Sequence, residues 1–64
     1  MKNRIAEIRK ANHMTQVQLA EAVGIAETQM QAYERNRRLP GVEIAIRIAK
    51  ALNTTVEDVF ILDD

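Results

Sequence analysis

The chain has 64 residues, 47% of them hydrophobic but only 3% aromatic, with no Cys and a formal net charge of zero. This length leaves room for one domain, residues 1–64, whose core must consist mainly of aliphatic side chains. The composition excludes disulfide bonds and thiolate zinc sites, and no apolar run reaches the roughly 18 residues of a membrane span.

Apolar residues recurring every three or four positions predict two short helices at the start of the chain. The first is expected over residues 2–11. The second begins after Thr15, which has the capping-box spacing with Gln18, and its buried face consists of Leu19, Ala20 and Val23. Gly24 ends this helix, because glycine adopts a positive φ without steric cost.

A third helix is expected from about residue 26 to residue 35, with Met30 and Tyr33 facing inward. Its outward residues are polar but only partly basic: Glu27, Thr28, Gln31, Ala32 and Arg35. Asn36 is suited to a left-handed helix end, and Pro40 prevents the helix from continuing through the loop that follows.

Two more helices follow this loop. The fourth has an apolar stripe consisting of Val42, Ala45, Ile48, Ala49 and Leu52. A short fifth helix starts at Thr55, which has the capping-box spacing with Asp58. The predicted fold is therefore all-α, a compact five-helix bundle. Helices two and three, joined by a turn containing Gly, are typical of a helix-turn-helix at about residues 15–36, although many such hairpins are only structural.

Specific residues strengthen this interpretation. They are Thr15, Gln16, Leu19, Ala20, Gly24, Met30, Tyr33, Glu34, Pro40 and the run Ile48–Leu52. With these residues the chain resembles the phage-repressor-like helix-turn-helix family, also called the xenobiotic-response-element or Cro/repressor family, over nearly its whole length. The resemblance implies a lambda-repressor-like domain that represses transcription. It also implies binding of double-stranded DNA at a palindromic operator, as a homodimer, with helix 26–35 in the major groove.

The resemblance also assigns the residues that contact bases. Glu27, Thr28 and Ala32 match positions that face bases in the family, with Gln29 and Gln31 beside them. Thr28 can form hydrogen bonds with a base edge, whereas Ala32 offers only a methyl contact. Glu27 can accept a hydrogen bond from a cytosine amino group, but an acidic residue in a first helical turn is also favoured by the helix macrodipole alone.

One departure from the family concerns the start of this helix. Ala26 stands where the family has Ser or Thr, and the loss of such a capping side chain typically costs about 1 kcal/mol. We therefore expect the start of the third helix to fray or to shift to Thr28.

The basic residues are unevenly placed, since residues 1–38 hold seven Lys/Arg and four Asp/Glu and the remainder holds two and five. The densest cluster, Arg35, Arg37 and Arg38, is expected to contact the DNA backbone, unless it is only a solvated loop. Gln16 matches a family residue that contacts a phosphate and braces the reading helix, with a plain polar helix start as the alternative.

Two further predictions concern structure and assembly. By the resemblance, Glu34 forms a structural ion pair with Arg9. A dimer interface is expected at the end of the chain, with candidate residues Val56, Val59, Phe60, Ile61 and Leu62. Alternatively, Val59 and Phe60 complete the core of the monomer, which would leave only Ile61 and Leu62 exposed.

Two other function classes can be weighed against DNA binding. Catalysis is disfavoured because the chain has one His, no Cys, no Gly-rich phosphate loop and no carboxylate pair expected to face inward. We also expect no cofactor, no metal and no small-molecule ligand, and a cytoplasmic location because residues at the N-terminus lack the apolar stretch of a signal peptide. The main alternative is a protein-interaction module on the same scaffold, antitoxin-like or antirepressor-like. Zero net charge, Glu27 and Ala32 favour it, whereas the arginine cluster and a reading face without apolar anchors oppose it.

Overall fold

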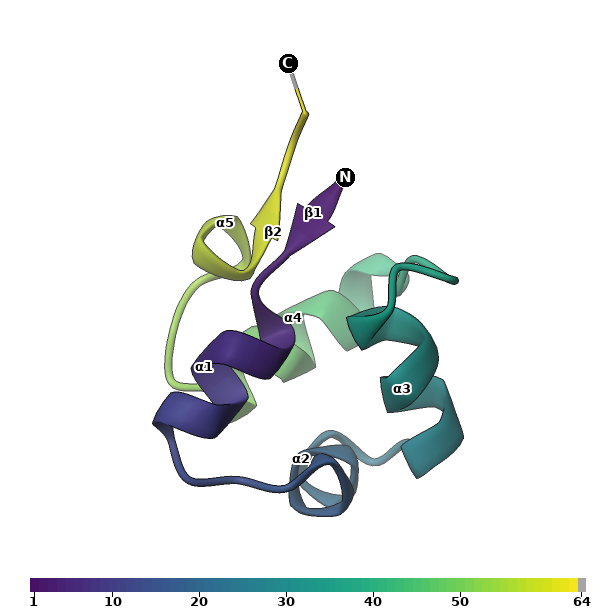
Figure 1. Cartoon of the computed structure of the whole chain (residues 1–64), viewed down its shortest axis with the longest axis vertical. Helices are drawn as coiled ribbons and strands as arrows, with labels where there is room; N and C mark the ends of the chain where they lie inside the picture. Colours follow the sequence, from purple (N-terminus) through teal and green to yellow (C-terminus); the bar gives the residue numbers. More distant parts are fainter. Residues whose placement is uncertain (64) are drawn as a thin grey trace.

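Five helices follow one another in the computed structural model, which describes residues 1–63, and two short strands pair beside them (Figure 1). The helices are α1 (Ile5–Ala11), α2 (Gln16–Val23), α3 (Glu27–Glu34), α4 (Val42–Ala51) and α5 (Val56–Val59). The strands β1 (Lys2–Asn3) and β2 (Phe60–Ile61) are antiparallel, with Lys2 opposite Ile61 and Asn3 opposite Phe60. The mostly helical fold with five helices is confirmed, and the all-α prediction is wrong at β1 and β2.

The strand pair also changes where the first helix begins. Residues 2–4 are not helical, and α1 starts at Ile5, whose backbone N–H donates to the side-chain oxygen of Asn3 at 3.1 Å. The Arg4 N–H donates to the Val59 carbonyl at 2.8 Å. The backbone groups before Ile5 therefore bind the far end of the chain, a pairing that local periodicity does not encode.

The predicted signals at the two ends of α2 are confirmed. The Gln18 N–H donates to the Thr15 hydroxyl oxygen at 3.0 Å, and the Thr15 N–H donates to the Gln18 side-chain oxygen at 2.9 Å, which completes a capping box. Gly24 ends the helix in the left-handed region with φ 85°. The N–H of Ile25 then donates back to the Ala20 carbonyl at 3.0 Å, so the chain reverses sharply before α3.

Replacing Gly24 with Ala is expected to lower the free energy of unfolding by about 1–2 kcal/mol, because a Cβ disfavours the left-handed conformation. Steric overlap adds little, since the nearest atom to that Cβ would be Nη1 of Arg47 at 3.8 Å. Urea unfolding measures the loss. Gly41→Ser is the control, because Gly41 is extended with φ −66° and nothing lies within 4 Å of its Cβ position. Equal losses in both variants would contradict the left-handed strain.

α4 packs on the core through the predicted residues except Val42. Val42 was expected on the buried stripe, but it is 79% exposed, so its assignment is wrong. The buried residues are Ile48, Ala49 and Leu52, with Ile44 and Ala45 half-buried above them. The stripe therefore runs through Ile44, Ile48 and Leu52, with Ala45 and Ala49 beside it, and Val42 lies outside it.

α5 has one half of the predicted capping box. The Asp58 N–H donates to the Thr55 hydroxyl oxygen at 3.2 Å, but the Asp58 carboxylate accepts from the Thr54 hydroxyl at 3.0 Å instead of from Thr55. The hydrogen bond from the Thr54 hydroxyl, and after it the nearby polar groups of Thr55, lower the pKa of the Asp58 carboxyl group. Asp58 thus stays ionised at the start of the helix, where the macrodipole favours a negative charge.

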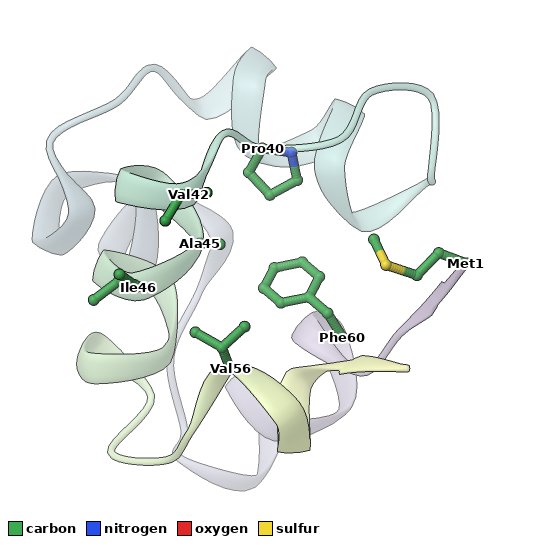
Figure 2. Close-up of a pocket in the computed structure, with 7 residues that line it drawn as sticks. All are labelled: Met1, Pro40, Val42, Ala45, Ile46, Val56 and Phe60. Atoms are coloured by element: carbon green, nitrogen blue, oxygen red, sulfur yellow. The ribbon is translucent and has the colours of Figure 1, made fainter. Parts of the chain in front are cut away.

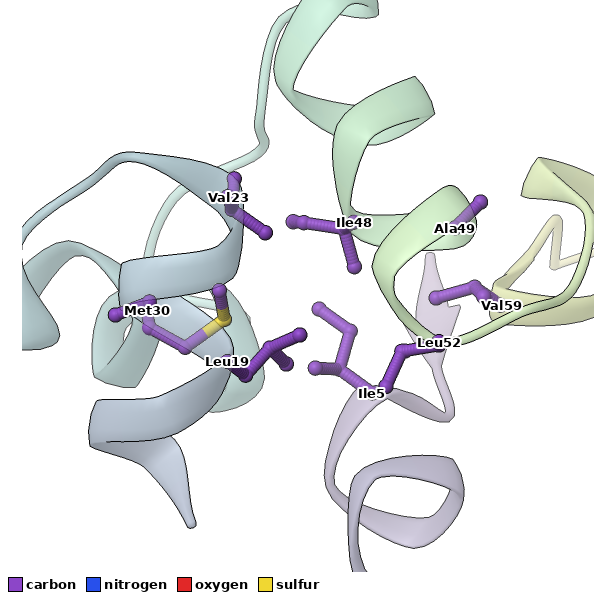
Figure 3. Close-up of a cluster of buried hydrophobic side chains, with 9 residues drawn as sticks. Ile5, Leu19, Val23, Met30, Ile48, Ala49, Leu52 and Val59 are labelled. Atoms are coloured by element: carbon purple, nitrogen blue, oxygen red, sulfur yellow. The ribbon is translucent and has the colours of Figure 1, made fainter. Parts of the chain in front are cut away.

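One apolar cluster holds the elements together (Figure 3). Every helix contributes, through Ile5, Leu19, Ala20, Val23, Met30, Ile48, Ala49, Leu52 and Val59. Ile8, Met14, Ile25 and Tyr33 are among the half-buried residues packed around it. The inward orientation predicted for Met30 is confirmed, because this side chain is 0% exposed. Among residues 1–63, no helix combines the length and the apolar character that crossing a membrane requires.

Candidate nucleic-acid interface

The start of α3 is the most exposed polar part of this helix. Glu27, Thr28 and Gln29 are exposed, whereas Gln31 and Ala32 are half-buried. All five predicted base-contacting residues thus lie on α3, but they differ in how accessible their side chains are to a ligand. The opposite side of the helix faces the core through Met30.

The start of α3 does not shift to Thr28, so that prediction is wrong. α3 begins at Glu27, and Ala26 occupies the N-cap position with φ −72° and ψ 151°. The side-chain oxygen of Gln29 accepts a hydrogen bond from the Ala26 backbone N–H at 3.1 Å. This is the half of a capping box that does not need an N-cap side chain.

A buried polar cluster fixes α3 relative to α1 and α2. Arg9 Nε donates to Glu34 Oε2 at 2.8 Å, and the two side chains are only 10% and 6% exposed. Arg9 Nη1 also donates to the Met14 carbonyl at 2.9 Å. The amide of Gln16, at the start of α2, donates to Glu34 Oε1 at 3.0 Å. We call Arg9, Gln16 and Glu34 the polar brace, because they join three helices through the end of α3.

The segment after α3 carries the exposed cationic groups. Arg35, Arg37 and Arg38 are all exposed, and no carboxylate of residues 1–63 forms an ion pair with them. Asn36 between them has the expected left-handed conformation with φ 58°. The Arg37 N–H donates to the Ala32 carbonyl at 2.9 Å, which returns the chain against the end of α3. The three side chains are therefore available to an anionic ligand.

Asn3 is a contributor that the sequence interpretation missed. Its side-chain nitrogen donates to the Tyr33 carbonyl at 3.0 Å and to the Asn36 side-chain oxygen at 2.9 Å. Asn3 therefore anchors the C-terminal end of α3 to β1. Neighbouring residues in the sequence do not indicate this role, because both acceptors of the Asn3 side-chain nitrogen lie 30 or more positions away.

The proposed dimer interface is only partly accessible. Val59 is 0% exposed and belongs to the core of the monomer, so its assignment to an intermolecular interface is wrong. Val56 and Phe60 are half-buried, Ile61 is 36% exposed and Leu62 is 79% exposed. The outward residues at this end of the molecule are therefore Ile61 and Leu62.

An apolar groove of about 400 Å³ lies beside these residues (Figure 2). It is lined by Met1, Pro40, Val42, Ala45, Ile46, Val56 and Phe60. Figure 2 shows the Phe60 ring in the middle, with Pro40 on one side and Val56 on the other. The sequence interpretation missed Val42 and Ile46 as surface residues. The groove combines side chains from three separate parts of the chain, at residue 1, residues 40–46 and residues 56–60, and periodicity within one helix does not predict such a surface.

Comparison with known proteins identifies similar sequences and folds. Residues 5–59 match the family model described as Helix-turn-helix. An HTH-type transcriptional regulator of Methanothermobacter thermautotrophicus is 43% identical over 65 residues, which cover 100% of this chain and 94% of that protein. The cryptic phage CTXphi transcriptional repressor RstR of Vibrio cholerae is 38% identical over 58 residues, covering 91% of this chain and 52% of that protein.

A solved structure has the same fold over most of the chain. It is a complex of the SinR protein and the SinI protein, which aligns with a TM-score of 0.79 and 27% sequence identity. The alignment covers 84% of this chain and 53% of the matched chain. The similarity in sequence and the similarity in structure therefore extend over largely the same residues.

Proposed function

The chain belongs to the helix-turn-helix family of DNA-binding transcription regulators, and from this we propose that it is a repressor whose α3 enters the major groove of a palindromic operator. In this proposal α2 and α3 form the helix-turn-helix motif. The observation that carries it is the exposed polar start of α3 together with three exposed arginines after the end of the helix, which have no ion-pair partners in the described chain. A second helix that presents its first residues to base edges is the usual docking mode of this motif.

Base recognition in this proposal depends on the first turn of α3. Thr28 is exposed there and can accept or donate at a base edge, or contact a thymine methyl group. Glu27 is exposed beside it and accepts a hydrogen bond from a cytosine amino group. Gln31 and Ala32 are half-buried one turn later, so less of each side chain is accessible to a base.

Contacts to the DNA backbone supply affinity that does not depend on base sequence. Arg35, Arg37 and Arg38 can each approach a phosphate, because all three are exposed after the end of α3. Gln16 uses one amide proton for Glu34 and keeps a second for a phosphate. This residue thereby connects a DNA contact to the polar brace that orients α3.

We infer a homodimer, because one such domain reads only a few base pairs. A two-fold axis places two reading helices about 34 Å apart on one face of DNA. The interface we propose consists of the apolar groove together with Ile61 and Leu62, and it excludes the buried Val59. An exposed apolar groove on a small domain is a candidate interaction surface, and a second copy of this chain is its proposed occupant.

The experiment that tests this function is selection of bound duplexes from a random-sequence DNA pool at about 150 mM salt, where nonspecific electrostatic binding is already weakened. Enrichment of an inverted repeat with half-sites about one helical turn apart is the expected result. Enrichment of a single half-site would reject the dimer and keep DNA reading. No enrichment would reject sequence-specific DNA binding.

Substitution of a residue that reads bases and substitution of a residue that binds phosphates should change DNA binding in different ways. Arg37→Ala or Arg38→Ala is expected to weaken binding to all duplexes and to reduce the slope of log K against log salt by roughly 0.9 per contact. Thr28→Val should change the preferred base at one position of each half-site, by about 1–3 kcal/mol of discrimination. Titrations against a panel of duplexes at several salt concentrations measure both effects.

Lys50→Ala is the matched control for these charge losses, because Lys50 is exposed in the last turn of α4, outside the proposed interface. It should leave the salt slope unchanged. If the arginine variants altered base preference as Thr28→Val does, the division into anchoring and reading residues would be rejected.

A second candidate function is a protein-interaction module, in which the groove accepts a different protein. The observation that favours it is the apolar groove, together with the similarity to SinR in its complex with SinI. This function predicts that the DNA selection enriches no sequence. It also predicts that Arg37→Ala leaves the affinity for the partner protein unchanged. The three exposed arginines without ion-pair partners among residues 1–63 favour an anionic ligand such as DNA, so the protein-interaction module is the second candidate.

A further inference from the structure

We propose that Gln29 is a positioning residue and not a base reader: its side chain caps the first turn of α3 in place of the side chain that Ala26 lacks. In this role Gln29 sets the direction in which Glu27 and Thr28 face DNA. The inference rests on the proposed function of α3. It also reassigns a residue that the family resemblance placed beside the base-contacting positions.

The comparison with α2 supports this assignment. Both helices have Gln at the third helical position, Gln18 in α2 and Gln29 in α3. In α2 the capping bonds run both ways, between Gln18 and Thr15. In α3 the return bond is missing because alanine has no acceptor, and the bond from the Ala26 N–H to the Gln29 oxygen at 3.1 Å remains. The start of α3 therefore has a single side-chain cap.

Apolar residues flank both starts in the same way. Met14 precedes the N-cap of α2 and Leu19 is its fourth helical residue, whereas Ile25 and Met30 occupy these positions in α3. Met30 and Leu19 are core residues, and Ile25 and Met14 pack against that core. This is the arrangement of a hydrophobic staple, which fixes the angle at which the chain enters a helix. The Gln29 cap therefore acts on the first turn of α3, which the packing of Ile25 and Met30 already holds against the core.

The hydrogen bond also restricts what Gln29 can do at a base. Recognition of adenine by glutamine is bidentate, since the side-chain oxygen accepts from N6 while the nitrogen donates to N7. In the structure that oxygen accepts from Ala26 instead. Gln29 would have to release the only side-chain cap of α3 in order to read adenine. Glu27 and Thr28, the first two residues of α3, have no such competing side-chain bond among the hydrogen bonds of residues 1–63.

The test compares Gln29→Ala with the double variant Gln29→Ala/Ala26→Ser. The Ala26 backbone is extended, so serine at this position can accept from a first-turn N–H and restore a cap. Gln29→Ala is expected to bind the selected operator about tenfold more weakly than the parent chain, with the same preferred base at every position. The double variant should recover most of that loss. A changed base preference in Gln29→Ala, or no recovery in the double variant, would overturn the inference.

A measurement without DNA separates this inference from the proposed function. Hydrogen exchange of the Ala26 N–H should be faster in Gln29→Ala than in the parent chain. The variant Gln29→Glu keeps an acceptor oxygen, so its Ala26 N–H should stay as protected as in the parent chain. Urea unfolding of each variant shows that the domain is folded under the exchange conditions. If the parent chain selects no DNA sequence, DNA reading fails while the cap is still tested. Unchanged exchange at Ala26 would reject the cap itself.

Discussion

Glu34→Ala is expected to lower the free energy of unfolding by about 3–5 kcal/mol, because it leaves the Arg9 guanidinium buried without its counter-charge. Both side chains of this pair are at most 10% exposed. The substitution also removes the acceptor of the Gln16 amide, so two polar groups lose their partner together. Since small domains have modest stability, this loss is a large share of the total free energy of unfolding.

Thermal and urea unfolding measure this effect. At about 4–8 °C per kcal/mol for a domain of this size, the melting temperature should fall by more than 10 °C. The matched control is Glu43→Ala, which breaks the pair of Glu43 with Arg47 on the surface of α4. The side chains of that pair are 75% and 50% exposed, so its loss should cost less than about 1 kcal/mol. Equal losses in the two variants would show that the polar brace does not hold the helices.

Leu62→Asp and Val42→Asp are each expected to raise the dissociation constant of the homodimer at least about 100-fold, which corresponds to about 2.7 kcal/mol. Both side chains are 79% exposed in the monomer, so the fold tolerates the change. In a two-fold interface each substitution occurs twice, and a carboxylate buried against an apolar groove has no partner there. Val42 starts α4, where an acidic residue is favourable for the helix itself.

Sedimentation equilibrium without DNA tests the dimer directly, so that charge repulsion from phosphates plays no part. Leu39→Asp is the control, because Leu39 is an exposed apolar residue at 65% that does not line the groove. It should leave the dissociation constant unchanged. A dimer that survives both Leu62→Asp and Val42→Asp would place the interface elsewhere on the molecule.

Signals that depend on neighbours along the chain were sufficient to predict α2 and its ends. Thr15, Gln18 and Gly24 act within one helix, and the structure has each of them in the expected conformation or bond. Pairing of β1 with β2 was not predictable in this way, because Lys2 and Ile61 lie at opposite ends of the sequence. Val42 was misplaced for a related reason: it shares the period of α4, but in the first turn of that helix Ile44 packs against the core and Val42 does not.

The candidate site shows the same division. The period of α3 was enough to predict that Met30 faces inward and that Glu27 and Thr28 face outward. How a polar side chain uses its hydrogen-bonding groups depends on the local backbone, and Gln29 illustrates this through its bond to Ala26. The groove was missed because its lining residues come from segments that only the folded chain brings together.

The antiparallel pairing of β1 with β2 has a consequence for assembly. Met1 lies next to β1 and Phe60 lies in β2, and both line the groove. The groove therefore has its shape only while the strands are paired and the Arg4 N–H is bound to the Val59 carbonyl. If a second copy occupies the groove, association and strand pairing are thermodynamically linked. The protection of these backbone amides from hydrogen exchange would then rise with protein concentration. Fraying of the strands would correspondingly weaken dimer formation at low concentration.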